Sequence, residues 1–206
     1  MPYSWLDALQ RVRAIAQTGL TYGRDEYDLE RYRELTAIAE HALAELLRVS
    51  PELVAERYVL EKGYPTPKVD VRTAVFSEDR VLLVRESADN LWTMPGGWAD
   101  ETDSPRQAAE REVEEESGYR VKVTRLISLK DRRAHDYQPK MLGGCYKIFF
   151  LADLLGGSPA TSLETSAVDF FALDRLPPLS VGRTLREDVE QAYAAHRDPT
   201  TPIVID

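Results

Sequence analysis

Apolar residues in the first third of the chain recur every three or four positions, the spacing of one helix face. One series covers residues 5–16 and a second covers residues 35–46. Between them, QTGLTYGRDEYD (17–28) carries two glycines and breaks the pattern, so the two series predict a helical hairpin. Ser50 followed by Pro51 combines a capping residue with a residue suited to the first turn, which predicts a third short helix.

The period changes after KGYPTPKVD (62–70), a segment with one glycine and two prolines that is typical of a linker. Beyond it, the pattern predicts a series of strands. These strands are expected at residues 69–76, 80–87, 91–97, 119–131, 145–155 and 167–173. One helix interrupts them and another is expected over residues 182–196, which indicates an α/β or α+β sandwich. We therefore expect a helical domain over 1–66 and a larger domain over 67–206.

The interrupting helix has clear limits in GWADETDSPRQAAEREVEEESGY (97–119). Ser104 is a favourable N-cap, Pro105 suits the first position, and Gln107 completes a capping-box pattern. Gly118 is a typical helix stop. The sequence therefore predicts a helix between Ser104 and Gly118.

The charge on this helix is unfavourable by itself. Glu112, Glu115 and Glu116 fall on one face, where like charges repel by roughly 0.2–0.5 kcal/mol per pair. Negative charge near the helix C-terminus also opposes the helix dipole. One interpretation is a solvated acidic face. The other is a hard divalent cation such as Mg²⁺ or Mn²⁺, held by these carboxylates and a carbonyl of the adjacent Gly96-Gly97 loop.

Composition narrows the possible classes of protein. The chain has 206 residues, of which 43% are apolar, so it is long and apolar enough to bury a core. Its net charge of −9 disfavours tight nucleic-acid binding unless a cation bridges the charges. Cys145 is the single cysteine and is expected to be a buried strand thiol. With no signal sequence and no apolar run of about 20 residues, we expect a cytoplasmic protein without a membrane anchor.

The acidic helix and the loop before it resemble the Nudix box, G-x5-E-x7-R-E-U-x-E-E-x-G-U, where U is a bulky apolar residue. The matching positions are Gly97, Arg111, Glu112, Val113, Glu115, Glu116 and Gly118. Asp103 stands where the box has glutamate, and Tyr119 replaces the final aliphatic residue. In the family, the acid at the position of Asp103 supports the box arginine, so its shorter side chain is expected to weaken that support.

The resemblance implies an α/β/α sandwich that hydrolyses a nucleoside diphosphate linked to another moiety X. It implies that Glu112, Glu115 and Glu116 bind Mg²⁺ or Mn²⁺ with the carbonyl of Gly97 or its neighbour, and that Arg111 orients the acids. Metal ions polarise the diphosphate and activate water in such reactions. For the general base, Glu112 is one candidate, and the downstream residues His135, Asp136 and Glu164 are others.

The resemblance extends to a Nudix subgroup that carries a helical N-terminal domain. QTGLTYGRDEYDLERYRELTAIA, EKGYPTPKVDVRTAVF and LWTMPGGWAD are similar to its members, which are called ADP-ribose or CDP-choline pyrophosphatases. We favour CDP-choline slightly, because aromatic faces bind quaternary ammonium groups. The alternatives are ADP-ribose hydrolysis, 3′-5′ trimming of RNA, and nucleotide binding without catalysis, as in a regulator.

The candidate substrate-binding residues are Tyr22, Tyr27, Tyr32, Trp98, His135, Glu164 and Arg183. For most of the aromatic residues, packing in a core or a dimer interface is the alternative, and Arg183 fits a phosphate contact or an ion pair equally well. Arg72 and Lys147, on expected strands, are weaker phosphate candidates. The apolar stripe of the N-terminal hairpin is too short to form its own core, so we expect a homodimer in which this region completes the substrate pocket.

Overall fold

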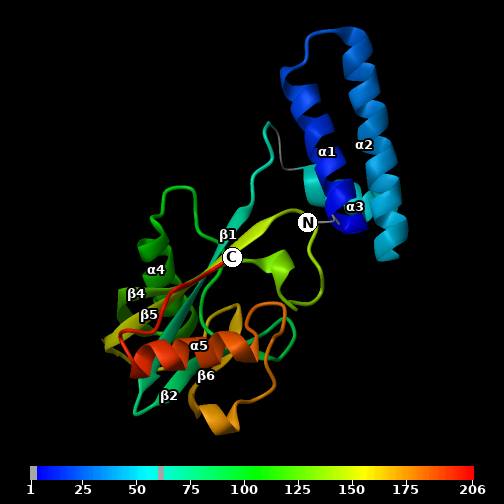
Figure 1. The fold of residues 1–206 in the computed structure, drawn as a ribbon. Coiled ribbons are helices and arrows are strands. Elements are labelled where there is room, and N and C mark those ends of the chain that lie inside the picture. The colour runs from blue at the N-terminus through cyan, green and yellow to red at the C-terminus, as the bar shows by residue number, and fades with distance from the viewer. Residues whose placement is uncertain (1–3, 60–62) are drawn as a thin grey trace. The chain divides into compact units, whose positions relative to one another are not determined.

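The computed structural model describes residues 4–59 and 63–206 of the chain (Figure 1). The chain divides into two compact units, Met1–Pro67 and Lys68–Asp206. In the described part of the chain, no helix combines the length and the apolar character that crossing a membrane requires.

The first unit is a group of three helices, α1 (Trp5–Tyr22), α2 (Glu26–Leu47) and α3 (Pro51–Val59). Ser4 caps α1 by accepting a hydrogen bond from the backbone N–H of Asp7 at 3.1 Å. The predicted start of α3 at Pro51 is confirmed. The helical hairpin is therefore built as the apolar periodicity indicates.

The break between the first two helices is shorter than we predicted. Helix α1 continues through Gly19 to Tyr22, and only residues 23–25 separate it from α2. A Cβ atom added to Gly19 would lie 2.5 Å from the ring of Tyr32 on α2. Gly19 thus serves close packing of the two helices rather than chain reversal.

The second unit is a mixed seven-stranded sheet with two α-helices. Its elements are β1 (Lys68–Ser77), β2 (Arg80–Glu86), β3 (Trp92–Thr93), α4 (Pro105–Ser117), β4 (Tyr119–Asp131), η1 (Arg132–Ala134), β5 (Cys145–Gly157), β6 (Thr165–Ala172), η2 (Leu173–Arg175), α5 (Arg186–Arg197) and β7 (Val204–Ile205). The strand order is β3-β2-β1-β5-β4-β7, and β6 pairs with β2. The predicted α/β class is confirmed.

Three predicted boundaries differ from the structure. The strand expected over 91–97 is limited to β3, the last helix begins at Arg186 rather than near 182, and β7 was not predicted. The late start of α5 has a local cause: the hydroxyl of Thr184 lies 2.8 Å from that of Thr93 and accepts from the backbone N–H of Met94. Residues 180–184 are therefore a turn packed on the end of β3.

Strand β1 and strand β2 separate soon after their hairpin, since they pair only at two positions next to the turn. Residues 95–99 occupy the edge of β1 that this separation leaves open. Val71 N–H donates to the Gly97 carbonyl at 2.8 Å, and Thr73 N–H donates to the Pro95 carbonyl at 2.9 Å. The Gly96-Gly97 turn is thus fixed directly on the central sheet.

The sheet carries one helix on each face. On one face, Ala108, Ala109 and Val113 of α4 pack with Val71 and Val75 of β1. On the other face, a second cluster joins α5 to the sheet. Its members include Ala74, Phe149, Val189, Ala192 and Ala195. This gives the expected α/β/α layering, and the C-terminal half of α4, which carries Glu112 and Glu116, lies beside the glycine turn. Cys145 is buried, as predicted.

Candidate active site

The predicted caps of α4 are confirmed. The hydroxyl of Ser104 accepts from Gln107 N–H at 3.3 Å, and the Gln107 side chain accepts from Ser104 N–H at 3.0 Å. Gly118 ends the helix with φ of 74°, a left-handed conformation that favours glycine. Local sequence thus determines where α4, the helix that carries the acidic residues, begins and ends.

Arg111 is the centre of the acidic cluster. Its Nε and Nη2 donate to one carboxylate oxygen of Asp103 at 3.1 and 3.0 Å. Its Nη1 donates to Glu112 and to Glu115, each at 3.0 Å. One guanidinium therefore braces three acids, and the shorter side chain of Asp103 still reaches it, contrary to the weakened support we expected.

The three box glutamates differ in their surroundings. Glu112 and Glu116 are buried, whereas the side chain of Glu115 is 59% exposed. Glu116 accepts from Gly96 N–H at 2.9 Å. A Cβ atom on Gly97 would lie 2.8 Å from Glu112 Oε2, so the missing side chain of Gly97 lets the turn approach Glu112. Two carboxylates, rather than three, form the buried part of the site.

Burial makes the charged form of both buried glutamates unfavourable. It raises the pKa of Glu116 to about 8, although Arg72 and the Gly96 N–H act in the opposite direction and Glu86 and Glu112 add to the rise. Burial also raises the pKa of Glu112, while Arg111 opposes that shift. The site therefore holds more negative charge than its own cations stabilise.

Glu86 is a further buried acid that our sequence analysis missed. It ends β2, is 5% exposed, and pairs with Arg183, whose Nε lies 2.9 Å from Glu86 Oε1. Arg183 also donates to Asp89 at 3.3 Å, so of its two predicted roles the structure contains the ion pair. A carboxylate two positions after a run of four buried apolar residues was the available signal.

The predicted aromatic residues lie in different places. Tyr22 and Tyr27, in the first unit, are 65% and 72% exposed, while the ring of Tyr32 is packed against Gly19. Trp98, in the second unit, is 46% exposed and lies under Lys68, whose Nζ is 5.7 Å from the ring centroid.

The three downstream candidates for the general base have different surroundings. His135 has both ring nitrogens engaged, with Glu187 at 3.1 Å and with Asp206 at 3.0 Å, and within the described chain it contacts no box carboxylate. Glu164 is exposed, and its backbone carbonyl accepts from Ser87 N–H, next to Glu86, at 2.7 Å. The negative charge of Glu164 contributes to the raised pKa of Glu86, so Glu164 lies near this buried acid. Asp136 is exposed in the loop after η1.

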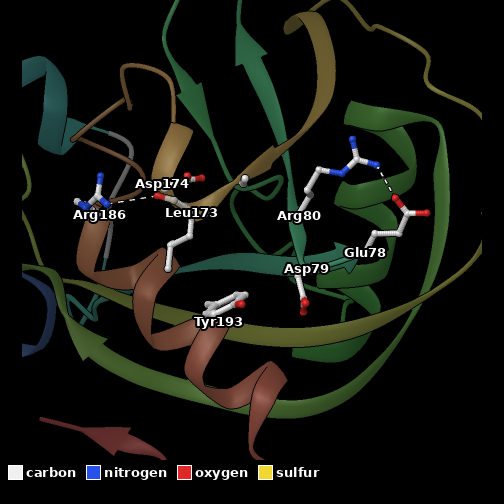
Figure 2. Close-up of a pocket in the computed structure, with 8 residues that line it drawn as sticks. Glu78, Asp79, Arg80, Leu173, Asp174, Arg186 and Tyr193 are labelled. Carbon is white, nitrogen blue, oxygen red and sulfur yellow. Dashed lines mark hydrogen bonds and ion pairs between the residues drawn. The ribbon is translucent and has the colours of Figure 1, made fainter.

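A pocket of about 470 Å³ lies elsewhere on the second unit, between the β1–β2 turn, η2 and α5. It is lined by Glu78, Asp79, Arg80, Ala172, Leu173, Asp174, Arg186 and Tyr193. Figure 2 shows Arg80 paired with Glu78, and Arg186 bonded at Leu173, so both cations of the pocket already have partners. No predicted site residue lines it, and Glu86 lies at the opposite end of β2.

The acids fit a divalent metal ion by chemistry, although they are engaged by protein groups in this arrangement. Across residues 4–59 and 63–206, no three His, Cys, Asp or Glu side chains converge as a ready metal site. The cause is visible: Arg111 holds Glu112 and Glu115, and Gly96 N–H holds Glu116. Hard carboxylate oxygens with excess buried negative charge nevertheless suit Mg²⁺ or Mn²⁺.

The raised pKa of Glu116 predicts a pH-dependent stability in the absence of metal. A carboxyl group with a folded pKa of about 8 and an unfolded pKa near 4.5 favours the folded state less as the pH rises between those values. In EDTA, the free energy of unfolding of the wild type relative to Glu116→Gln should therefore fall from pH 5 to pH 8. Urea denaturation at several pH values measures this difference, and a flat difference would contradict the burial argument.

Comparison with known proteins finds two families that match this chain. Residues 66–192 match the family described as NUDIX domain, and residues 3–57 match the one described as UDP-X-like, N-terminal oligomerisation domain. A putative ADP-ribose pyrophosphatase, YjhB of Bacillus subtilis (strain 168), is 40% identical over 98% of this chain and 97% of its own length.

Two solved structures are also similar. A UDP-X diphosphatase is 32% identical, covers 98% of both chains and has a TM-score of 0.64. An ADP-ribose pyrophosphatase from Streptococcus suis 89-1591 is 38% identical, covers 68% of this chain and all of its own, and has a TM-score of 0.63. With the box acids, their bracing arginine and the glycine turn in one place, the chain belongs to the Nudix family and is a pyrophosphohydrolase.

Proposed function

We propose that this enzyme hydrolyses the diphosphate of ADP-ribose to AMP and ribose 5-phosphate. The observation that carries the reaction is a pair of buried acids beside the Gly96-Gly97 turn: Glu112, which Arg111 braces, and Glu116, which accepts from Gly96 N–H. The choice of ADP-ribose is supported by two relatives named for that substrate, one of which matches 98% of this chain.

The reaction adds one water across the anhydride. The water oxygen forms a bond to one phosphorus, the bond from that phosphorus to the bridging oxygen breaks, and the second phosphate leaves with the bridging oxygen. A bound divalent ion supplies charge neutralisation and an activated water. Glu112 and Glu116, with the Gly97 carbonyl, would hold the ion, and Arg111 fixes the orientation of Glu112.

CDP-choline is the second candidate substrate. It is favoured by Tyr22 and Tyr27, two exposed rings on the N-terminal unit that can receive a quaternary ammonium group. Tyr32 is a poorer candidate because its ring is packed against Gly19. Processing of RNA is disfavoured by the net charge of −9. Binding without catalysis is disfavoured because all the box carboxylates and Arg111 are present.

A side-by-side assay tests the proposal. Purified protein with Mg²⁺ is given ADP-ribose, CDP-choline or a short RNA, and products are separated by chromatography. We expect kcat/KM to be at least about tenfold higher for ADP-ribose, the size of one favourable hydrogen bond or pocket contact. The control is Glu116→Gln purified in parallel, which exposes contaminating activity. A higher kcat/KM for CDP-choline would replace ADP-ribose, and inactivity on all three would reject the function.

The first unit supports a homodimer as the working form. Its two long helices expose apolar residues: Trp5, Val12 and Ile15 on α1, and Leu35, Ile38 and Leu46 on α2. On α2 these recur at the spacing of one helix face, as in a helix that packs on another surface. Exposed apolar stripes of this kind mark association sites.

We predict that Ile38→Asp shifts the protein from dimer to monomer, because it places a charge within an apolar contact. Ile38 is 56% exposed in the single chain, so folding should be kept. Arg33→Asp is the matched control, since Arg33 is exposed on the opposite side of the same helix from Leu35. Analytical ultracentrifugation at micromolar concentration measures the result. A monomeric wild type, or a dimeric Ile38→Asp, would exclude this interface.

A further inference from the structure

Arg72 connects the central strand to the glycine turn. It lies on β1, is 4% exposed, and forms a two-pronged ion pair with Asp70 through hydrogen bonds of 3.1 and 3.0 Å. Its Nη1 also donates to the carbonyl of Met94 at 3.3 Å. The guanidinium therefore ties Asp70 to the residue that leads into the turn, and it is not free to bind phosphate as our sequence analysis suggested.

The turn held in this way sets the position of Glu116. Gly96 lies so close to β1 that an added Cβ would be 2.0 Å from the Val71 carbonyl, and its φ of 142° favours glycine. Its N–H is the group that donates to Glu116. Any shift of the 94–97 segment away from β1 would therefore move the hydrogen-bond donor of this carboxylate.

The charges around Arg72 also link it to the acids of the candidate site. Asp70 also pairs with a second cation, because Lys147 Nζ lies 2.6 Å from Asp70 Oδ1, and Lys147 is 1% exposed. Two buried cations thus share one carboxylate, which leaves one positive charge in this trio without a partner inside it. Glu116 and Glu86 are the next acids that act on Arg72. Because buried charges are costly without compensation, the trio and the site acids stabilise one another.

We propose that Arg72 is a positioning residue of the hydrolase site, which holds the 94–97 segment on β1 and keeps a fixed positive charge beside Glu116 and Glu86. The inference rests on the proposed function, because it requires Glu116 to hold the metal ion. Arg72 acts through the turn and through Glu116.

The test measures Mn²⁺ affinity by calorimetry together with kcat and KM. Arg72→Met should weaken Mn²⁺ binding about tenfold or more and lower kcat about 10–100-fold, the usual cost of losing a group that orients metal ligands. The KM for substrate should change little. Arg72→Lys should fall between Arg72→Met and wild type, because it keeps the charge but not the two-pronged geometry.

Lys130→Met is the matched control. Lys130 is also a fully buried cation on the sheet and lies opposite Lys147 in the pairing of β4 with β5, but its own ion pair, at 2.6 Å, is with Asp188. It should lose stability yet keep Mn²⁺ affinity and kcat. Arg72→Met with the same Mn²⁺ affinity and kcat as Lys130→Met would overturn the proposal. If Arg72→Met does not fold, Arg72→Lys decides, since unchanged affinity and kcat in that variant overturn it as well.

Glu116→Gln separates the two possible failures. If it weakens Mn²⁺ binding and the Arg72 variants do not, the positioning role is wrong and the metal site stands. If Glu116→Gln itself leaves Mn²⁺ affinity unchanged, the proposed metal site is wrong, and the role of Arg72 is overturned with it.

Discussion

Replacing Glu116 with glutamine should lower kcat by about two to three orders of magnitude at pH 8 with saturating Mg²⁺. Stabilisation by a catalytic metal ion amounts to several kcal/mol, and each 1.4 kcal/mol corresponds to a factor of ten. Glu116 is the more buried of the two site acids and the one fixed by the Gly96 N–H. Glutamine keeps the size of the side chain, so the loss reports on charge and metal rather than on packing.

The control for this result is Glu114→Gln. Glu114 lies on the same helix, is exposed, and has no contact with Arg111 within the described structure. It should keep kcat within about twofold, as expected of a surface substitution. Steady-state kinetics over a range of Mg²⁺ concentrations measure both variants. If Glu116→Gln turns over at the wild-type rate, the buried acids are not the metal site.

Glu116→Gln is expected to change stability and activity in opposite directions, and both effects come from the loss of one buried charge. Metal-free Glu116→Gln should be more stable than wild type at pH 8, because it removes a buried charge, while it loses activity in the presence of metal. Sites that are strained without their ligand commonly trade stability for function in this way. An enzyme in which both stability and activity fell would instead indicate a packing role for Glu116.

The sequence predicted α4 well because the signals that define it are local. Ser104, Pro105, Gln107 and Gly118 lie within one helix length, and each acts through the nearest backbone groups. The spacing of the box acids follows from the same helix. A pattern read over fifteen residues can therefore place these groups without any knowledge of the rest of the fold.

What the sequence did not predict depends on contacts between distant segments. Glu86 and Arg72 belong to the acidic site only because β2 separates from β1 and residues 95–99 take its place on β1. The hydrogen bond between Gly96 and Glu116 spans twenty residues. Strand pattern alone gives the face on which Arg72 lies, but it does not give the partner segment that covers it.

Gly19 shows the same limit in the helical unit. A glycine within an apolar series was interpreted as a break, which is the usual local meaning. Its actual role is set by Tyr32, thirteen positions later, whose ring occupies the space that a side chain would take. The predicted role of Tyr32 in substrate binding loses support for the same reason.

Replacing Arg111 with lysine should be the second large effect, a loss of about 10–100-fold in kcat. Arg111 donates four hydrogen bonds to Asp103, Glu112 and Glu115 through three nitrogens with fixed geometry. A single ammonium group keeps the charge but does not reach all three acids at once. Glu112 would then lose its fixed orientation beside the glycine turn, so kcat should fall more than KM rises.

Asp103 provides the internal test of this brace. Asp103→Asn should lower kcat about tenfold, and the double variant with Arg111→Lys should be no worse than Arg111→Lys alone, because both changes break one unit. Arg106→Lys is the control, since Arg106 lies on the same helix but donates to the Val123 carbonyl. Kinetics of the wild type, the two single variants and the double variant complete the cycle. Multiplicative losses would mean that Asp103 and Arg111 act independently, and the brace would have to be abandoned.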